Sequence, residues 1–352
     1  MQRRSDHDVT NTVDISRPAV VRSAVCNILR RRYPGVDVAP VRAAFDTFTR
    51  GYAGLLDGFH GCDTWYHDVQ HSLDCTLAMT RLIDGHDRIA PASKKLGPRR
   101  AVLGIICALF HDSGYLRRWS EKQFQKGAQF TLYHVSRSGD FLAEFLPTVG
   151  FAREAELARR LVHYTGYEIA LDRIPVRSAK DKRIGYMLGS ADLLSQLSDR
   201  CYPEKCFKFL YHEFETAGLA GAPVQGVRKP TYASPEDLMQ KTPGFVQKLF
   251  AERLDGYFEG VRGHMTSHFN GPDPYTAQID KHIAYITRVL ETGDLKLLRR
   301  RPRPINGRRV RQLLGIRLSL SHALRRPLRP EHRRTHARHV PGKKRVAQYV
   351  PV

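Results

Sequence analysis

The sequence predicts an all-α protein, and three observations support that class. Apolar residues recur at three- and four-residue spacings over most of residues 41–292, as they do on one face of an α-helix. No segment alternates apolar and polar residues in the manner of a β-strand. Clusters of Gly, Pro and Ser, such as GLAGAPVQG at 218–226 and NGPDP at 270–274, separate the helical patterns and indicate loops.

The predicted helices follow one another along this region. Residues 41–56 and 73–83 each carry one apolar face. Residues 98–112, PRRAVLGIICALFHD, are apolar on nearly every side, so we expect a buried central helix there. Further helices are predicted over 134–146, 153–163, 181–197, 204–217, 236–260 and 275–290.

Composition divides the chain into three regions. Residues 1–40 are polar and rich in arginine, and we expect an N-terminal leader or a loosely packed helix. Residues 41–295 carry the helical patterns and are predicted to be the domain that holds any active site. Residues 296–352 are predicted to be a basic C-terminal tail.

The tail holds most of the excess positive charge. The whole chain has 57 Lys+Arg and 35 Asp+Glu, a net charge of +22, and between Arg299 and Val352 there are 17 Lys+Arg and one acid, Glu331. We predict that this segment is disordered or weakly helical and that small-substrate activity does not need it. Residues 310–326 could form a basic amphipathic helix on nucleic acid or an anionic membrane. A solvated appendage without a dedicated partner is an equally good interpretation.

The cysteines and the apolar runs favour a cytoplasmic, soluble protein. Six cysteines are scattered without CxxC or zinc-finger spacing, which fits a reducing compartment. The N-terminal residues lack the apolar stretch of a signal peptide. The longest apolar run, AVLGIICALF at 101–110, is too short to span a bilayer.

One short segment, TWYHDVQHSLD at 64–74, concentrates polar side chains that could do chemistry. If Asp63 or Thr64 caps a helix here, His67 and His71 lie on one face, because positions four apart share a face. Asp74 follows on that face. Two histidines at this spacing are, taken alone, equally compatible with a structural role.

A second group of polar residues lies within apolar helices. In LFHDSGY at 109–115, His111 and Asp112 end the predicted central helix, and Asp192 interrupts the apolar run IGYMLGSADLLSQL at 184–197. Buried imidazole and carboxylate groups need partners, and a divalent cation is a direct one. Nitrogen and carboxylate ligands suit Zn, Fe, Mn or Co, and carboxylates with water suit Mg.

Other candidates are weaker when taken singly. His134 and His163 lie at the ends of predicted helices, where a hydrogen-bonded structural imidazole is the simpler interpretation. The segment YLRRWSEK at 115–122 offers Arg117, Arg118 and Lys122 as ligands for a substrate phosphate, although a solvated surface is the more usual role of such a run.

Taken together, the order His-x3-His, His-Asp, His, His and Asp resembles the HD superfamily of metal-dependent phosphohydrolases. Over roughly residues 60–260, and most closely in YHDVQHSLD at 66–74, the chain is similar to class I cyclic-nucleotide phosphodiesterases, whose element is YHNxxHxxDV. Asp68 stands where that element has asparagine. The family's nucleotide-clamping glutamine and phenylalanine have no clear copy, and Gln196 and Phe245 are the candidates.

The resemblance implies roles for particular residues. It makes His71, His111, Asp112 and Asp192 ligands of a first metal, with Asp112 bridging to a second. It places His134 and His163 at the second metal and makes His67 the acid that protonates the leaving oxygen. Asp74 or Asp68 could orient an imidazole from behind the ligands.

These assignments predict a hydrolase. One or two divalent ions (Mn, Fe, Zn, Mg or Co) would supply a metal-activated hydroxide, and His67 would act as general acid on a nucleotide or cyclic-nucleotide phosphoester. One alternative is an HD regulatory module that senses a nucleotide and whose tail binds nucleic acid or membrane. Another is a helical protein with one structural metal, which has less need of so many potential ligands.

Overall fold

The computed structural model describes residues 3–221 and 230–315, and within these ranges the all-α prediction is confirmed. No β-strand occurs in the described ranges, where extended pairing is limited to isolated bridges such as Phe59 with Arg118. The helices are α1 (Pro18–Arg32), α2 (Ala39–Ala53), α3 (Val69–Ile89), α4 (Gly97–Phe110), α5 (His134–Phe145), α6 (Ala155–Leu161), α7 (Ala179–Ser198), α8 (Tyr202–Lys205), α9 (Tyr211–Thr216), α10 (Pro235–Leu249), α11 (His264–Phe269), α12 (Pro274–Thr292) and α13 (Gly307–Leu313). Two π-helical turns, Cys206–Leu210 and Phe250–Tyr257, continue α8 and α10.

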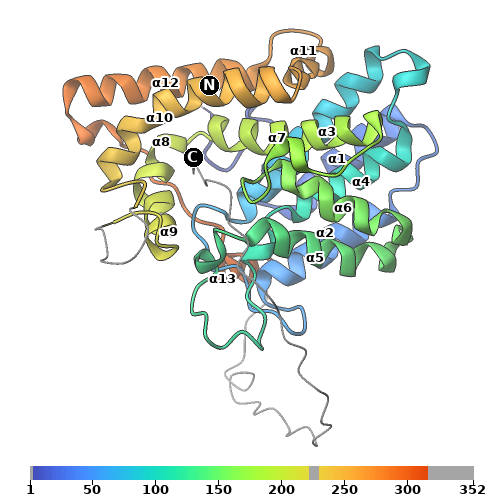
Figure 1. Ribbon diagram of the computed structural model, residues 1–352, viewed down its shortest axis with the longest axis horizontal. Helices are drawn as coiled ribbons and strands as arrows, with labels where there is room; N and C mark the ends of the chain where they lie inside the picture. The colour runs from blue at the N-terminus through green and yellow to red at the C-terminus, as the bar shows by residue number, and fades with distance from the viewer. Residues whose placement is uncertain (1–2, 222–229, 316–352) are drawn as a thin grey trace, which may run out of the picture.

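Helix α3 is the centre of the molecule. It packs against α7, α4, α1 and α11, and all but its last two residues are buried. Gly85 permits the contact with α11, because a Cβ there would lie 1.9 Å from the carbonyl oxygen of His264. Helices α10 and α12 run along one edge of the molecule, and α8 and α9 lie to one side of the central helices (Figure 1). The expected burial of 98–112 is confirmed, since every residue of α4 from Ala101 onward is buried.

The start of α3 differs from the expected one. Its N-cap is Asp68, whose carboxylate accepts from the backbone N–H of His71, and neither Asp63 nor Thr64 has that role. Thr64 instead donates its hydroxyl proton to the carbonyl oxygen of His67 at 2.6 Å. His67 therefore precedes the helix, and it does not share a helical face with His71 as the four-residue spacing suggested.

The described part of residues 1–40 is packed into the fold, contrary to the expectation of a loose leader. Val21 and Val25 of α1 are fully buried, and α1 lies against α3. Asp8 is also fully buried, and Arg81 on α3 donates to it at 2.6 Å. Arg3 reaches the carbonyl oxygen of Ser198 at 2.7 Å. The polar composition of this segment reflects buried ion pairs and hydrogen bonds.

The first part of the predicted tail also belongs to the fold. Ile305 and Val310 are buried, and α13 packs against α2. The backbone N–H of Ile305 donates to Asp68 Oδ2 at 2.7 Å, and that of Gly307 donates to the carbonyl oxygen of Cys62 at 2.8 Å. The remainder of the tail, and with it most of the possible helix at 310–326, lies outside the described residues.

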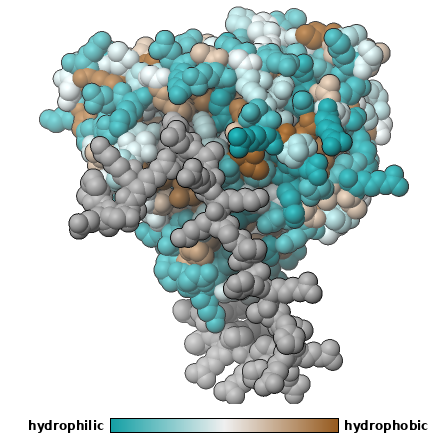
Figure 2. Space-filling model, viewed as in Figure 1, coloured by the Kyte–Doolittle hydropathy of each residue, from teal (hydrophilic) through white to brown (hydrophobic). Residues whose placement is uncertain are grey.

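Three further observations concern the cysteines, the apolar character of the helices and the surface. All six cysteines are buried and unpaired. Among the described helices, none combines the length and apolar character that crossing a bilayer requires. Figure 2 shows hydrophilic residues over most of the described surface on this face, with hydrophobic residues in separate small patches.

Candidate metal centre

Four side chains that the sequence nominated as metal ligands converge on one point. The Nε2 atoms of His71 and His111 lie 3.2 Å apart. Asp112 Oδ2 is 3.4 Å from the first of these atoms and 3.2 Å from the second. Asp192 Oδ1 is 3.1 Å from His71 Nε2 and 3.5 Å from His111 Nε2. All four residues are buried.

Three central helices bring these residues together. His71 lies in the first turn of α3, His111 follows the last residue of α4, and Asp192 faces them from the middle of α7. Gly114 lets the start of α5 approach the His-Asp pair, because a Cβ there would lie 1.9 Å from the carbonyl oxygen of His134. Close packing of the start of α5 therefore requires a residue without a Cβ at Gly114, the glycine of HDSGY.

The orientation of the rings fits a bound cation. His111 Nδ1 donates to the carbonyl oxygen of Ala108 at 2.8 Å, so in the neutral ring Nε2 presents a lone pair to His71 Nε2. Asp112 Oδ2 is buried and has no hydrogen-bond partner among the described residues. Opposed lone pairs and carboxylate oxygens are unfavourable together unless a cation lies between them. The donor set of nitrogen and oxygen suits a divalent transition metal.

The carboxylates of the cluster are in their ligand form. Burial by itself raises the pKa of Asp112, but the adjacent His111 outweighs this effect and the pKa is lowered. Burial also raises the pKa of Asp192, but the adjacent imidazoles of His111 and His71 outweigh burial, and the pKa is lowered. Cys75 also has its sulfur close to His111 and Asp192. Burial raises the pKa of the Cys75 thiol to about 11, so without a cation the thiol stays protonated.

His134 extends the cluster, whereas His163 is not shown to join it. His134 Nε2 is 3.6 Å from Asp112 Oδ1, and its Nδ1 donates to the carbonyl oxygen of Thr131 at 2.8 Å. Burial lowers the pKa of His134, which favours the neutral ring that binds metal. His163 is buried with its Nδ1 unpartnered among the described residues, and it does not line the cavity described below.

His67 is held by a glutamate that the sequence analysis did not identify. Its Nδ1 is hydrogen-bonded to Glu213 Oε2 at 2.7 Å. Glu213 Oε1 accepts the backbone N–H groups of Trp65 and Tyr66 at 2.6 and 2.7 Å. Burial lowers the pKa of His67, but the Glu213 carboxylate outweighs burial and the pKa is raised. An acid within the pattern of 204–217 was the only signal, and nothing linked it to His67.

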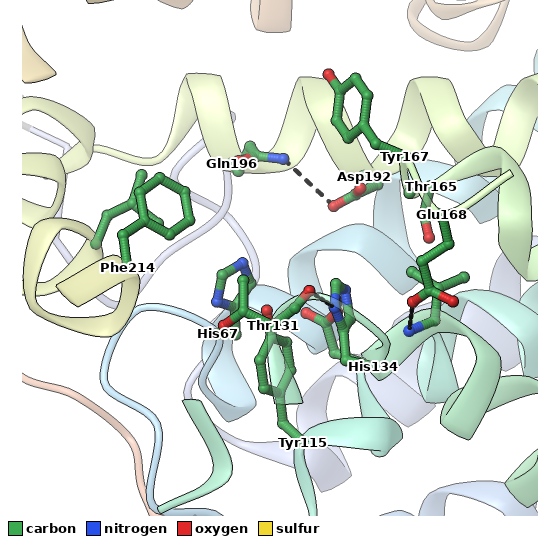
Figure 3. Close-up of a pocket in the computed structure, with 14 residues that line it drawn as sticks. His67, Tyr115, Thr131, His134, Thr165, Tyr167, Glu168, Asp192, Gln196 and Phe214 are labelled. Atoms are coloured by element: carbon green, nitrogen blue, oxygen red, sulfur yellow. Dashed lines mark hydrogen bonds and ion pairs between the residues drawn. The ribbon is translucent and has the colours of Figure 1, made fainter. Parts of the chain in front are cut away.

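The imidazole rings of His67 and His134 both stack on the ring of Tyr115. The ring of Tyr115 lies 4.7 Å from that of His67 and 4.4 Å from that of His134, with interplanar angles of 20° and 18°. The labelled side chains in Figure 3 show His67 and His134 with Tyr115 on one side of the cavity, and Asp192 and Gln196 entering from α7 on the other. The stack places the proposed acid beside the ligand cluster.

A cavity of about 570 Å³, counting the space that is open to solvent, lies beside this cluster. Its lining comprises His67, Asp112, Tyr115, Thr131, His134, Val135, Thr165, Gly166, Tyr167, Glu168, Asp192, Gln196, Leu210 and Phe214. Gln196, a candidate clamp residue, is on this wall and donates to Asp192 Oδ1 at 3.5 Å. Phe245 lines a neighbouring pocket that shares Gly166 and Tyr167 with the cavity.

Two aspartates do not orient an imidazole through a hydrogen bond in the described structure. The carboxylate of Asp68 accepts the backbone N–H groups of His71 and Ile305, so its role is to cap α3 and hold the C-terminal segment. Asp74 is buried, and neither carboxyl oxygen has a hydrogen-bond partner among the described residues. Burial raises its pKa to about 7.

The basic residues after the His-Asp pair lie away from the cavity. Arg117 donates to Asp63 at 3.1 Å, Arg118 donates to Glu144 at 2.9 Å, and Lys122 is exposed. None of the three is among the described residues that line the cavity. Their expected contact with a substrate phosphate remains a prediction.

Comparison of the sequence with models of known protein families and with curated proteins gives no match. The likeness to the HD superfamily therefore depends on the residues themselves. The all-α architecture and the buried cluster of His71, His111, Asp112 and Asp192 are compatible with that superfamily.

Proposed function

We propose that this protein is a metal-dependent phosphohydrolase of the HD type that cleaves a nucleotide-type phosphoester, with a cyclic-nucleotide diester as the first candidate. The observation that carries the proposal is that a cluster of four potential ligands and a separate, half-buried acid lie beside the same cavity. His67 lines the cavity together with Asp112 and Asp192, and Glu213 holds its far nitrogen. A nucleotide sensor would need the cluster but not the His67–Glu213 pair.

Each residue has a definite task in this scheme. His71, His111, Asp112 and Asp192 would hold the first cation, and His134 would hold a second that shares Asp112. Divalent ions there would activate water and neutralise the non-bridging phosphate oxygens. His67 carries a proton on Nε2 toward the ester, and the Glu213 carboxylate keeps that ring charged until the leaving oxygen takes the proton. The reaction would run in the cytoplasm, which the six buried and unpaired cysteines support.

The test is an activity screen after reconstitution with Mn, Fe, Zn, Mg or Co. The substrates are cyclic mononucleotides, cyclic dinucleotides, nucleoside phosphates and inorganic polyphosphates. We expect hydrolysis of a nucleotide substrate with at least one metal, and loss of that activity in His111→Ala. The matched control is His212→Ala, since the His212 side chain is 57% exposed and, within the described ranges, its one hydrogen bond is to Glu215.

Two outcomes would contradict the proposal. One is the absence of hydrolysis across the whole screen with correctly folded, metal-loaded protein. The other is equal activity in His111→Ala and His212→Ala, which would mean that the cluster does not support the reaction.

A further inference from the structure

A second cavity, here called the rear basic pocket, lies between the N-terminal segment and the segment before α13. Its volume, including the space open to solvent, is about 1010 Å³. Arg4 lines one wall, and Arg301, Arg303 and Arg309 line the other. None of these residues lines the cavity of the candidate metal centre.

The four arginines of the rear basic pocket are exposed and lack acidic partners. Among the described residues, no carboxylate lies within ion-pair distance of Arg4, Arg301, Arg303 or Arg309. The pocket has one acid in its lining, Asp6, which is already hydrogen-bonded to His7 Nδ1 at 2.7 Å. Some other surface arginines do meet acids, as Arg22 meets Asp46 and Arg99 meets Glu154. The pocket therefore concentrates positive charge that the fold leaves uncompensated.

The floor of the rear basic pocket is built from buried polar groups. Lys205 is 5% exposed, and its ammonium donates to Asp199 Oδ2 at 2.7 Å. Burial lowers the pKa of Lys205, but Asp199 outweighs burial and raises it, so the side chain is charged. An ammonium has three donors, and the described structure gives this one a single acceptor. Gln70, also 5% exposed, bonds to Asp199 and to the carbonyl oxygen of Ser5.

We propose that the rear basic pocket binds a small anion that carries two or more phosphate groups, such as a nucleoside polyphosphate or an inorganic oligophosphate. Guanidinium groups bind phosphate oxygens in pairs, and several of them converging on one concave site match more charge than one phosphate carries. A buried, charged Lys205 at the floor adds a donor that a flat surface would lack. The concave shape favours a small molecule over a nucleic-acid strand.

The same segment connects the rear basic pocket to α3. Arg303 is two residues before Ile305, whose backbone N–H bonds to Asp68, and Asp68 also caps the turn that carries His71. An anion that links Arg4 to Arg301 and Arg303 would hold this segment against the helix. Binding should therefore raise the thermal stability of the whole chain.

The experiment is calorimetric titration of the full chain with ATP, inorganic tripolyphosphate and orthophosphate. We expect ATP and tripolyphosphate to bind and orthophosphate to bind much more weakly, with affinity falling as salt rises. The double variant Arg301→Gln/Arg303→Gln should lose about tenfold or more in affinity, because each removed guanidinium gives up a charge-assisted contact. Arg4→Gln on the opposite wall should weaken binding as well.

Two control variants separate this pocket from other sources of binding. Arg308→Gln removes a charge from an exposed neighbour that does not line the pocket, and its affinity should stay within about twofold of the parent value. Asp112→Ala removes a predicted metal ligand and should bind ATP and tripolyphosphate normally. Tighter binding of ATP than of tripolyphosphate would identify the ligand of the pocket as a nucleotide. The reverse order would identify it as an inorganic oligophosphate.

Several results would overturn the proposal. Absence of binding of both polyphosphates is the simplest. Equal weakening by Arg308→Gln would mean that diffuse surface charge attracts the anion. Binding that is lost in Asp112→Ala but retained in the double arginine variant would belong to the metal centre. A single-stranded oligonucleotide that outcompetes ATP through Arg301 and Arg303 would make the pocket part of a nucleic-acid surface.

Discussion

The hydrogen bond between Glu213 and His67 allows a sharp test of how the proposed acid works. In Glu213→Gln, the amide oxygen can still accept from Trp65 and Tyr66, while the amide nitrogen faces His67 Nδ1 and removes the negative charge there. A hydrogen bond to a charged group contributes about 1.5–3 kcal/mol. If that amount stabilises the charged ring during proton transfer, kcat/KM should fall roughly 10- to 150-fold.

The assay compares an alkyl phosphodiester, which needs a proton on its leaving oxygen, with a p-nitrophenyl diester, which needs it less. We expect the loss on the alkyl substrate and a much smaller loss on the p-nitrophenyl substrate, with metal content unchanged. Glu215→Gln is the matched control on the same helix, because the Glu215 side chain is exposed and, among the described residues, its one hydrogen bond is to His212 at 3.3 Å. Equal losses on both substrates, or equal losses in both variants, would refute the reasoning.

Three further predictions concern metal retention and the two ends of the chain. Asp112→Ala should lose bound metal, because Oδ2 of Asp112 lies in the cluster and its Oδ1 lies beside His134. An unchanged metal content in elemental analysis would refute the assignment. Asp8→Asn should destabilise the fold at neutral pH, since it leaves Arg81 buried without its carboxylate. Burial raises the pKa of Asp8, but Arg81 outweighs burial and lowers the pKa to about 2. About 2 kcal/mol of this stabilisation is therefore present above pH 4 and is lost as the pH falls toward 2. Unfolding measured at several pH values should show the difference in stability between parent and variant narrowing over that range. A chain ending at Gly315 should unfold like the parent. A chain ending at Leu298 should lose roughly 3–6 kcal/mol of its free energy of unfolding, because Ile305 and Val310 are removed from the core. Equal stability of the two chains in denaturant unfolding would contradict the docking of this segment.

The ligand cluster could be predicted from sequence because its signals are local. His111 and Asp112 directly follow a helix whose second half is wholly apolar, and Asp192 interrupts another buried helix. Each position therefore indicates a buried polar group that needs a partner. The relation of His67 to His71 was predicted with the wrong geometry. Asp68, the residue after His67, caps the helix, which begins at Val69. The rings of His67 and His71 are neighbours, with centroids 6.1 Å apart, but they do not share a helical face.

The remaining features could not be read from local pattern. Glu213 is 146 positions from His67, and only the tertiary fold brings α9 to that imidazole. The packing of the first forty residues depends on partners such as Arg81 and Ser198, which are far away in sequence. The packing of the first part of 299–352, which we expected to be disordered or weakly helical, was missed for the same reason, since the partner of Ile305 is Asp68. That small-substrate activity does not need this segment stays a prediction.

The packing of two imidazoles on one tyrosine has a mechanical consequence. The rings of His67 and His134 both lie against Tyr115, at 4.7 and 4.4 Å, and their own centroids are 6.2 Å apart. A phenylalanine in that place would keep these ring contacts, whereas a small side chain would remove a support that both imidazoles share. The position of the proton donor relative to the outermost candidate ligand thus depends on a third side chain that has neither role.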